Sequence, residues 1–369
     1  MTAKATAIIF VGGWGASEPE QALRRAHQAA ALDLLEALSE TGLVGRSVIA
    51  TDGPWMGVPC DSSIEIDQDD SASPFHFGER LAGLIERYGA ECVLYAGGGS
   101  APLLGPEQWR SVLQRLLAAE HLVVANNLHS CDWVGFTPAA AVVARIAALA
   151  GDNGLAWTLA HDGGISAEDM PASAATRFDI DTPSDLLIAR QHSGIGARLR
   201  RFVDGLDWDD SQVRGVTRAM QKEGGTLAVI GRTCATAWSF VEKSTRCWVR
   251  VLAEERGMRA SGREKQGQVA SLVADYLDLV GVEGFFGRLS ELVEGMMMDS
   301  RVVFAARGLR PSTSDRFNSD LHRWQAVEEP FLKQFTRAAA SAGVPVLLGG
   351  QSLVSGGLMA LVESLERGV

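Results

Sequence analysis

Residues 5–13 read ATAIIFVGG, an apolar run from Ala5 to Val11, interrupted by Thr6, that ends in two glycines. A run of this length before glycine is typical of a strand buried on both faces of a sheet. Residues 18–40 then repeat apolar side chains with the spacing of a helix and are rich in strong helix formers. A buried strand followed by a helix predicts the first step of a parallel sheet covered by helices.

The same alternation continues through the first half of the chain. We expect further strands at 46–52, 91–99 and 121–127, and further helices at 77–89, 106–119 and 138–150. Strands that are apolar throughout and alternate with helices predict an α/β fold with a mostly parallel sheet. Ligands of such sheets bind beyond the carboxyl ends of the strands, so unusual residues at those ends are the first candidates for a site.

The second half has the same character, and no internal repeat links it to the first. We expect strands at 225–231, 247–255, 300–306 and 344–350, and helices at 233–244, 268–281 and 283–297. The 369 residues exceed the usual size of one hydrophobic core. We therefore predict two α/β domains, residues 1–198 and 199–369, with a connector at 192–202. The three methionines at 296–298 are expected to pack in a core.

Composition narrows the class of protein. Hydrophobic residues make up 46% and charged residues 21% of the chain, as in an ordinary globular protein. A net charge of -11 argues against a general nucleic-acid binder, which needs a basic face. The five cysteines never occur in CxxC spacing, which favours reduced thiols. Without a signal peptide or a membrane span in the sequence, we expect a cytoplasmic protein. The size of the chain and its tryptophan content suggest a homodimer.

Residues 178–186 read FDIDTPSDL and place two carboxylates one residue apart. In a strand, Asp179 and Asp181 would share a face, where like charges need a cation or donors between them. The pair is therefore a candidate magnesium site that bridges nucleotide phosphates. The alternative is a helix start, in which Asp181 or Thr182 caps the backbone and Pro183 occupies the first turn.

The segments SEPEQALRRAHQAAALDLLEAL, VLYAGGGSAPLL and FDIDTPSDLLIA together resemble nucleotidyltransferases of the molybdenum-cofactor and 2-phospholactate guanylyltransferase type. The resemblance covers roughly residues 1–195 and none of the rest. It implies a nucleotide-sugar-transferase-like, three-layer Rossmann-type domain, and catalysis and metal binding by Asp179 and Asp181. Ser100 stands where that family has a metal-binding aspartate, and the loop GGWGASEPE lacks the family's Arg-Met-Gly and lysine. Mg²⁺ would then depend on Asp179 and Asp181, with Asp52 as a further candidate.

Other candidates for nucleotide binding follow the predicted strands. The glycine turns let backbone amides approach phosphates or a base, although tight connections need glycine anyway. Asn126 and Asn127 could read a base edge or simply form a turn, His129 is a candidate general base, and Trp14 could stack on a base. The nucleotide-binding candidates of this half are Gly12, Gly13, Asp52, Gly97, Gly98, Gly99, Ser100, Asn126 and Asn127.

The second half has a candidate anion pocket near its strand ends, with Arg232, Glu255 and Arg256 as its binding residues. Arginine forks bind phosphate or carboxylate with two aligned donors. An internal network of arginines and glutamates is the alternative. GGQSLVSGG at 349–357 could add helix amides and the hydroxyls of Ser352 or Ser355.

These observations favour a nucleotidyltransferase-like protein that moves a nucleotidyl group from an NTP to a phosphorylated or carboxylated small molecule with Mg²⁺. Two alternatives stay open. The first is a nucleotide- or metabolite-binding protein without transfer chemistry, and the second is an enzyme whose chemistry lies in the second domain. The expected partners in each case are small molecules, a nucleotide and an acceptor, and neither nucleic acid nor a membrane.

Overall fold

The computed structural model describes residues 4–13, 15–55, 62–69 and 74–367. Contacts divide the chain into two compact units. The first contains residues 1–13, 24–177 and 196–199, and the second contains residues 14–23, 178–195 and 200–369. This division differs from a boundary at residue 198, because the FDIDTPSDL segment packs with the second unit although it precedes the predicted connector.

The first unit contains a seven-stranded sheet in the order β3-β2-β1-β4-β6-β5-β7. Its strands are β1 (Ala5–Val11), β2 (Val44–Thr51), β3 (Ile64–Gln68), β4 (Val93–Gly97), β5 (Leu122–Ala125), β6 (Trp133–Thr137) and β7 (Ser166–Asp169). Every pairing is parallel except the two made by β6, which is antiparallel to β4 and to β5. The predicted mostly parallel sheet is therefore confirmed.

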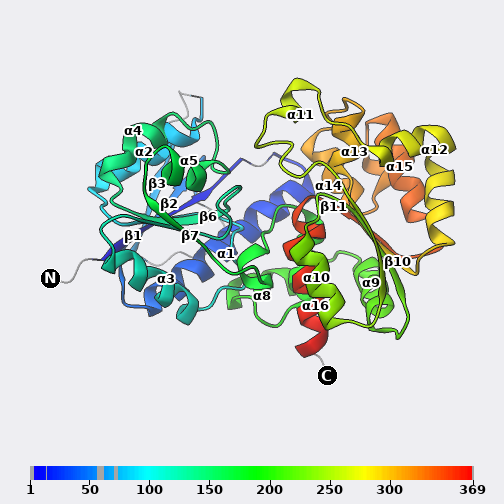
Figure 1. Cartoon of the computed structure of the whole chain (residues 1–369), viewed down its shortest axis with the longest axis horizontal. Helices are drawn as coiled ribbons and strands as arrows, with labels where there is room; N and C mark the ends of the chain where they lie inside the picture. The colour runs from blue at the N-terminus through cyan, green and yellow to red at the C-terminus, as the bar shows by residue number, and fades with distance from the viewer. Residues whose placement is uncertain (1–3, 14, 56–61, 70–73, 368–369) are drawn as a thin grey trace. The chain divides into compact units, whose positions relative to one another are not determined.

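Helices cover both faces of this sheet (Figure 1). They are α1 (Glu18–Glu40), α2 (Phe77–Tyr88), α3 (Pro106–Ala118), α4 (Val143–Ala147), α5 (Leu155–His161) and α6 (Ala174–Arg177). Side chains alternate along β1, so that Ile8 packs in the core with α2, α4 and α5, whereas Ile9 packs in the core with α1 and α3. The result is the three-layer α/β architecture that the strand–helix alternation predicts.

Three strands of this sheet, β3, β6 and β7, were not predicted. Polar residues interrupt β3 and β7, which lie at the two edges of the sheet and need no apolar run. The five residues of β6 follow β5 through a polar turn with no helix between the two strands, so the strand–helix alternation does not mark this strand. The predicted helix at 138–150 is reduced to a 3-10 turn (Ala140–Val142) and the short α4.

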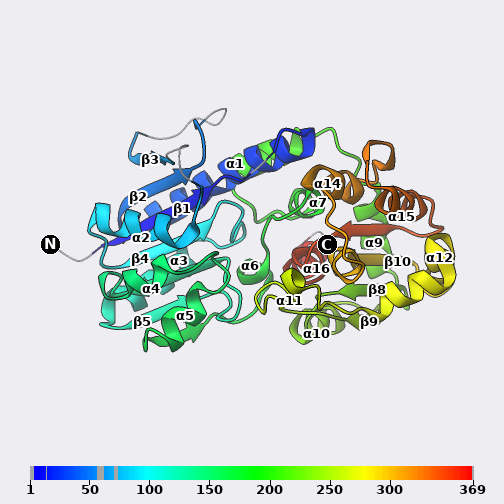
Figure 2. The same cartoon turned by 90° about the horizontal axis from the view of Figure 1, so that it is seen from above.

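The second unit contains a four-stranded parallel sheet in the order β11-β10-β8-β9, which Figure 2 shows from above. Its strands are β8 (Thr226–Gly231), β9 (Trp248–Ala253), β10 (Gly295–Asp299) and β11 (Val346–Gly349). Its helices are α7 (Pro183–Gln191), α9 (Ser211–Gln221), α10 (Ala235–Ser244), α11 (Arg263–Gln266), α12 (Leu272–Ser290), α13 (Arg301–Ala306), α14 (Thr313–Asp320), α15 (Pro330–Ala340) and α16 (Gly356–Arg367). The helix α8 (Ala197–Asp204) has residues in both units. The core formed with α12 and α15 covers one sheet face, and α9 contacts the sheet on the other.

Two predicted elements of the second unit are wrong. Residues 295–297 belong to the central strand β10 rather than to a helix, and residues 301–306 form α13 rather than a strand. Methionine is a good helix former, but Met296, Met297 and Met298 are completely buried between β8 and β11, and this environment overrides propensity. Within the described part of the chain, no helix is long and apolar enough to cross a membrane.

Candidate functional site

The first unit has its topological switch point between β1 and β4. The chain runs from β1 to β2 and β3 on one side, and β4 pairs with the other side of β1. Ligands of open α/β sheets bind in the crevice outside the carboxyl ends of two such strands. Both predicted glycine turns lie here, because Gly12-Gly13 follows β1 and Gly98 follows β4. The structure therefore brings the two turns together.

Glycine is required at these turns for different reasons. The Gly98 amide donates to Phe10 O at 2.8 Å, and a Cβ on Gly98 would lie 2.9 Å from Val11 Cγ2. Gly13 has a φ of 85°, a conformation that other residues rarely adopt. Its amide donates to Asp52 Oδ2 at 2.6 Å, and Arg24 lies 3.5 Å from Asp52 Oδ1. Asp52 thus holds the first glycine turn in place, a contact that the sequence did not indicate.

Ser100 and Asn126 are buried and use their polar atoms to brace neighbouring backbone. Ser100 Oγ donates to Asp132 O at 2.9 Å. The Asn126 amide donates to Asp132 Oδ2 at 2.7 Å and accepts from the Asp132 N–H at 3.0 Å. Asn127 Oδ1 accepts from the His129 N–H, and the His129 ring stacks on Trp157 with centroids 4.8 Å apart. These contacts are those of a turn, the second of the two readings of the asparagine pair.

Trp14 lies outside the described residues, and Gly15 belongs to the second unit. There the buried Glu20 accepts from the Gly15 N–H at 3.2 Å and from Ser17 Oγ at 2.6 Å. A glutamate three residues after a serine is the sequence signal of a capping box, so this contact could have been predicted.

The FDIDTPSDL segment forms a helix start. Asp179 makes an isolated bridge and its neighbours form no regular strand, which corrects the expected strand. Thr182 is the N-cap of α7 and Pro183 is its first residue. Asp185 Oδ2 accepts from the N–H of Thr182 at 2.8 Å, from Thr182 Oγ1 at 2.8 Å and from the Asp181 N–H at 3.1 Å. The capping interpretation is therefore confirmed, with Asp185 as a partner that the sequence analysis missed.

Asp185 is completely buried, which sets its protonation state. Burial and, to a lesser degree, the nearby charge of Asp181 raise the pKa of Asp185 to about 8, although the three hydrogen bonds to Oδ2 act to lower it. Asp185 Oδ1 is buried without a hydrogen-bond partner. The carboxyl group is accordingly held in its neutral form at pH 7, where it costs less to bury.

The donor chemistry of Asp179 and Asp181 suits a hard cation such as Mg²⁺, because both supply carboxylate oxygen. Asp181 is exposed and Asp179 is half-buried. Within the described ranges, no three His, Cys, Asp or Glu side chains form a cluster that could hold a metal ion.

The predicted anion pocket of the second unit contains pairs of opposite charge. Arg232 is buried and donates from Nε and Nη2 to Asp299 at 2.5 and 3.1 Å. Glu255 pairs with Arg263 at 2.9 Å, and Arg256 is exposed. Their contacts match the alternative of an internal network.

The two candidate serines of GGQSLVSGG also have partners within the protein. Ser352 Oγ donates to Asp179 O at 2.6 Å, and Ser355 Oγ donates to Gln351 O at 2.7 Å.

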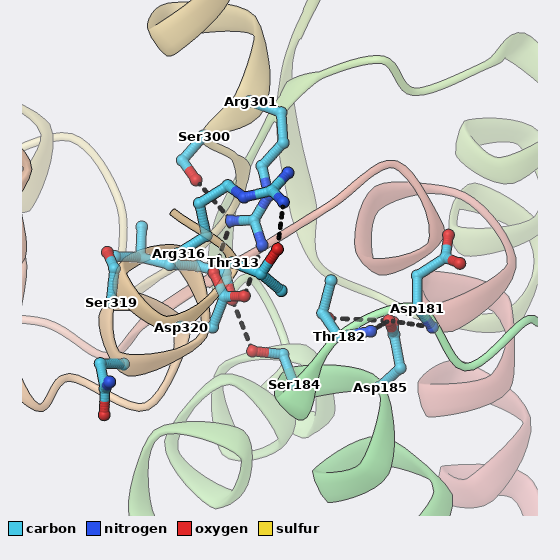
Figure 3. Close-up of polar contacts among 12 residues, drawn as sticks. Asp181, Thr182, Ser184, Asp185, Ser300, Arg301, Thr313, Arg316, Ser319 and Asp320 are labelled. Atoms are coloured by element: carbon cyan, nitrogen blue, oxygen red, sulfur yellow. Dashed lines mark hydrogen bonds and ion pairs between the residues drawn. The ribbon is translucent and has the colours of Figure 1, made fainter. Parts of the chain in front are cut away.

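A second buried ion pair lies at the end of β10, and sequence reasoning missed it. Arg301 donates to both carboxylate oxygens of Asp320 at 2.6 Å each, and to Ser300 Oγ at 3.0 Å (Figure 3). Side chains of Arg301 and Asp320 are 5% and 0% exposed. The side chains of Asp299, Ser300 and Arg301 follow one another at this strand end, but the sequence pattern predicts residues 300–306 as the strand itself and so hides the site.

No family model matches the sequence, and no curated protein matches it either. Solved structures do resemble the chain. The 2-C-methyl-D-erythritol 4-phosphate cytidylyltransferase of Thermus thermophilus is 16% identical, with 50% of this chain and 97% of that chain covered and a TM-score of 0.36. A cytidylyltransferase of Leptospira borgpetersenii is 10% identical, with 55% and 93% covered and a TM-score of 0.38. The manganese complex of Rv0371C from Mycobacterium tuberculosis H37Rv is 16% identical, with 55% and 100% covered and a TM-score of 0.35.

Proposed function

We propose that this protein is a nucleotidyltransferase whose first unit binds a nucleoside triphosphate at the carboxyl ends of β1 and β4. The observation that carries the proposal is the position of both glycine turns at the switch point of the sheet, where the Gly98 amide meets Phe10 O. Backbone without side chains lets a nucleotide approach closely, and because the Gly13 and Gly98 amides donate to Asp52 and to Phe10 O, other amides of these turns would contact the phosphates. We also propose that the protein is related to nucleotidyltransferases of the molybdenum-cofactor and 2-phospholactate guanylyltransferase type, as the sequence resemblance implies.

In the proposed reaction, an oxygen of a phosphorylated or carboxylated acceptor attacks the α-phosphorus of the nucleotide. A new P–O bond forms, the bond between the α- and β-phosphates breaks, and pyrophosphate leaves. Mg²⁺ would supply positive charge that offsets the negative charge developing on the phosphates, and Asp179 and Asp181 are its ligands as the resemblance implies them. Asp52 would keep the first glycine turn in the conformation that accepts the nucleotide.

The test uses the full chain with each of the four NTPs, with and without Mg²⁺. We expect one NTP to raise the unfolding temperature and, with the right acceptor, to release pyrophosphate. Asp181→Asn should abolish the Mg²⁺-dependent part of the shift, whereas the exposed Asp207→Asn should leave it unchanged. The absence of any nucleotide-dependent shift at millimolar concentration would contradict nucleotide binding.

A second candidate function is nucleotide binding without transfer. It is favoured by Ser100, which stands at the position of the family's metal-binding aspartate and whose hydroxyl is engaged by Asp132 O. Under this alternative, the nucleotide raises the unfolding temperature equally with and without Mg²⁺. Pyrophosphate is then not released with any acceptor, and Asp179→Asn behaves as the unmodified protein does.

A further inference from the structure

Arg316 of α14 is a guanidinium group without an acidic partner. Its Nη2 donates to Thr313 Oγ1 at 3.0 Å, and its Nε is buried without a hydrogen-bond partner. Among the residues that the structure describes, no carboxylate forms an ion pair with it. A buried donor without an acceptor costs free energy, so its persistence in a folded protein calls for an explanation.

The charges around Arg316 leave it uncompensated. Four charged side chains shift the pKa of Arg316: the cations Arg301 and Arg259 and the acids Asp320 and Glu264. Each cation is paired with one of the acids, Arg301 with Asp320 at 2.6 Å and Arg259 with Glu264 at 3.0 Å. Burial, followed by the charges of Arg301 and Arg259, lowers the pKa of Arg316 to about 10. The guanidinium therefore remains charged at neutral pH, and the local sum of charge is one positive unit.

The scaffold around Arg316 is firmly held. Ser312 caps α14 by accepting from the Asp315 N–H at 3.0 Å, and Asp315 accepts from the backbone of Glu328 and Glu329. Figure 3 shows Arg316 together with Arg301, Thr313 and Asp320. Because Arg301 is fixed by its buried ion pair, the guanidinium of Arg316 cannot be neutralised by taking Asp320 from it without breaking that pair.

We propose that Arg316 is the recognition residue of an oxyanion site in the second unit, which takes a phosphate or carboxylate group of a small molecule. The Nε–H and one N–H of Nη2 lie on the same edge of the guanidinium and would supply the two aligned donors of an arginine fork, while the other N–H of Nη2 donates to Thr313 and keeps the fork oriented. This site lies within the second unit and does not depend on the proposed nucleotide binding.

The test measures thermal unfolding of the full chain in inorganic phosphate, in acetate and in chloride of equal ionic strength. At ten times its Kd, phosphate should lower the unfolding equilibrium constant about elevenfold, which is a rise in Tm of roughly 3–5 °C. Arg316→Gln should weaken phosphate binding by roughly ten- to a hundredfold. Arg310→Gln, an exposed arginine of the preceding segment, is the matched control and should bind phosphate as the unmodified protein does.

In the chloride buffer without phosphate or acetate, we expect Arg316→Gln to be at least as stable as the unmodified protein, because the substitution removes a buried uncompensated charge. Arg316→Lys keeps the charge without the fork and should bind phosphate with intermediate affinity. A saturable effect of acetate alone would identify a carboxylate site. Equal phosphate binding by Arg316→Gln and the unmodified protein, or no saturable effect of either anion, would overturn the proposal. A failed nucleotide titration would leave it standing.

Discussion

Replacing Asp185 with Asn should change how the stability of the second unit depends on pH. Asp185 is buried, and its pKa of about 8 in the folded protein stands against an ordinary value of 3.8. Between these two values the folded chain keeps the proton and the unfolded chain releases it. Stability therefore falls as pH rises through this window, and the loss is complete once pH passes the folded pKa.

The magnitude follows from the size of the shift. Each pH unit inside the window costs about 1.4 kcal/mol, so the rise from pH 5 to pH 7 costs about 2.7 kcal/mol. Asparagine carries no proton to lose, and its oxygen can accept the hydrogen bonds that Asp185 Oδ2 accepts from Thr182. The free energy of unfolding of Asp185→Asn, minus that of the unmodified protein, should increase by this amount over the same range.

Urea unfolding followed by circular dichroism at several pH values measures this difference directly, because all other titrating groups cancel. Asp204→Asn, which removes a carboxyl that is 54% exposed, is a suitable control for the loss of a surface carboxylate. Asp181→Asn should reduce the slope by removing a charge that raises the pKa of Asp185. A constant difference between Asp185→Asn and the unmodified protein from pH 5 to pH 7 would refute the neutral, buried carboxyl.

Three further predictions concern packing and burial. Arg301→Met leaves Asp320 buried and unpaired and should destabilise the protein by about 3–5 kcal/mol in urea unfolding, whereas the double change Arg301→Met with Asp320→Leu should recover most of the loss. Gly98→Ala places a Cβ 2.9 Å from Val11 Cγ2 and should cost roughly 1–3 kcal/mol. Gly83→Ala, exposed on α2 with nothing within 4 Å, should instead gain roughly 0.5–1 kcal/mol, and equal effects of the two alanines would contradict the close approach. Burial raises the pKa of Cys92 and of Cys131 to about 12, so a thiol reagent at pH 8 should modify native protein at the partly exposed cysteines and spare these two, as peptide mapping would reveal; rapid loss of either would contradict their burial.

Local sequence pattern was sufficient where one element could be recognised without its neighbours. The strand Ala5–Val11 and the helix Glu18–Glu40 lie where the sequence predicts them, because an apolar run before glycine and a long helical periodicity leave few alternatives. The same reasoning failed for Met296–Met298 and for β6. These strands are specified by the strands beside them rather than by their own residues.

The candidate sites divide in the same way. That glycine turns would follow β1 and β4 could be predicted, since both turns are contiguous with their strands. The Thr182–Pro183 helix start could be predicted as well, because a cap and the first turn of a helix depend on neighbouring residues. The role of Asp185 could not, since its protonation is set by how completely the surrounding second unit buries it.

The sequence alone determined the α/β class, the alternation of strands and helices, and the positions of the turns, because these depend on side-chain periodicity and on glycine and proline within a few residues. Only the tertiary structure decided which charges are neutralised. Arg232 meets Asp299 and Arg301 meets Asp320 across 67 and 19 residues, while Arg316 meets no acid among the described residues. Pairing between distant charges is decided by packing, and packing is a property of the whole unit rather than of any segment.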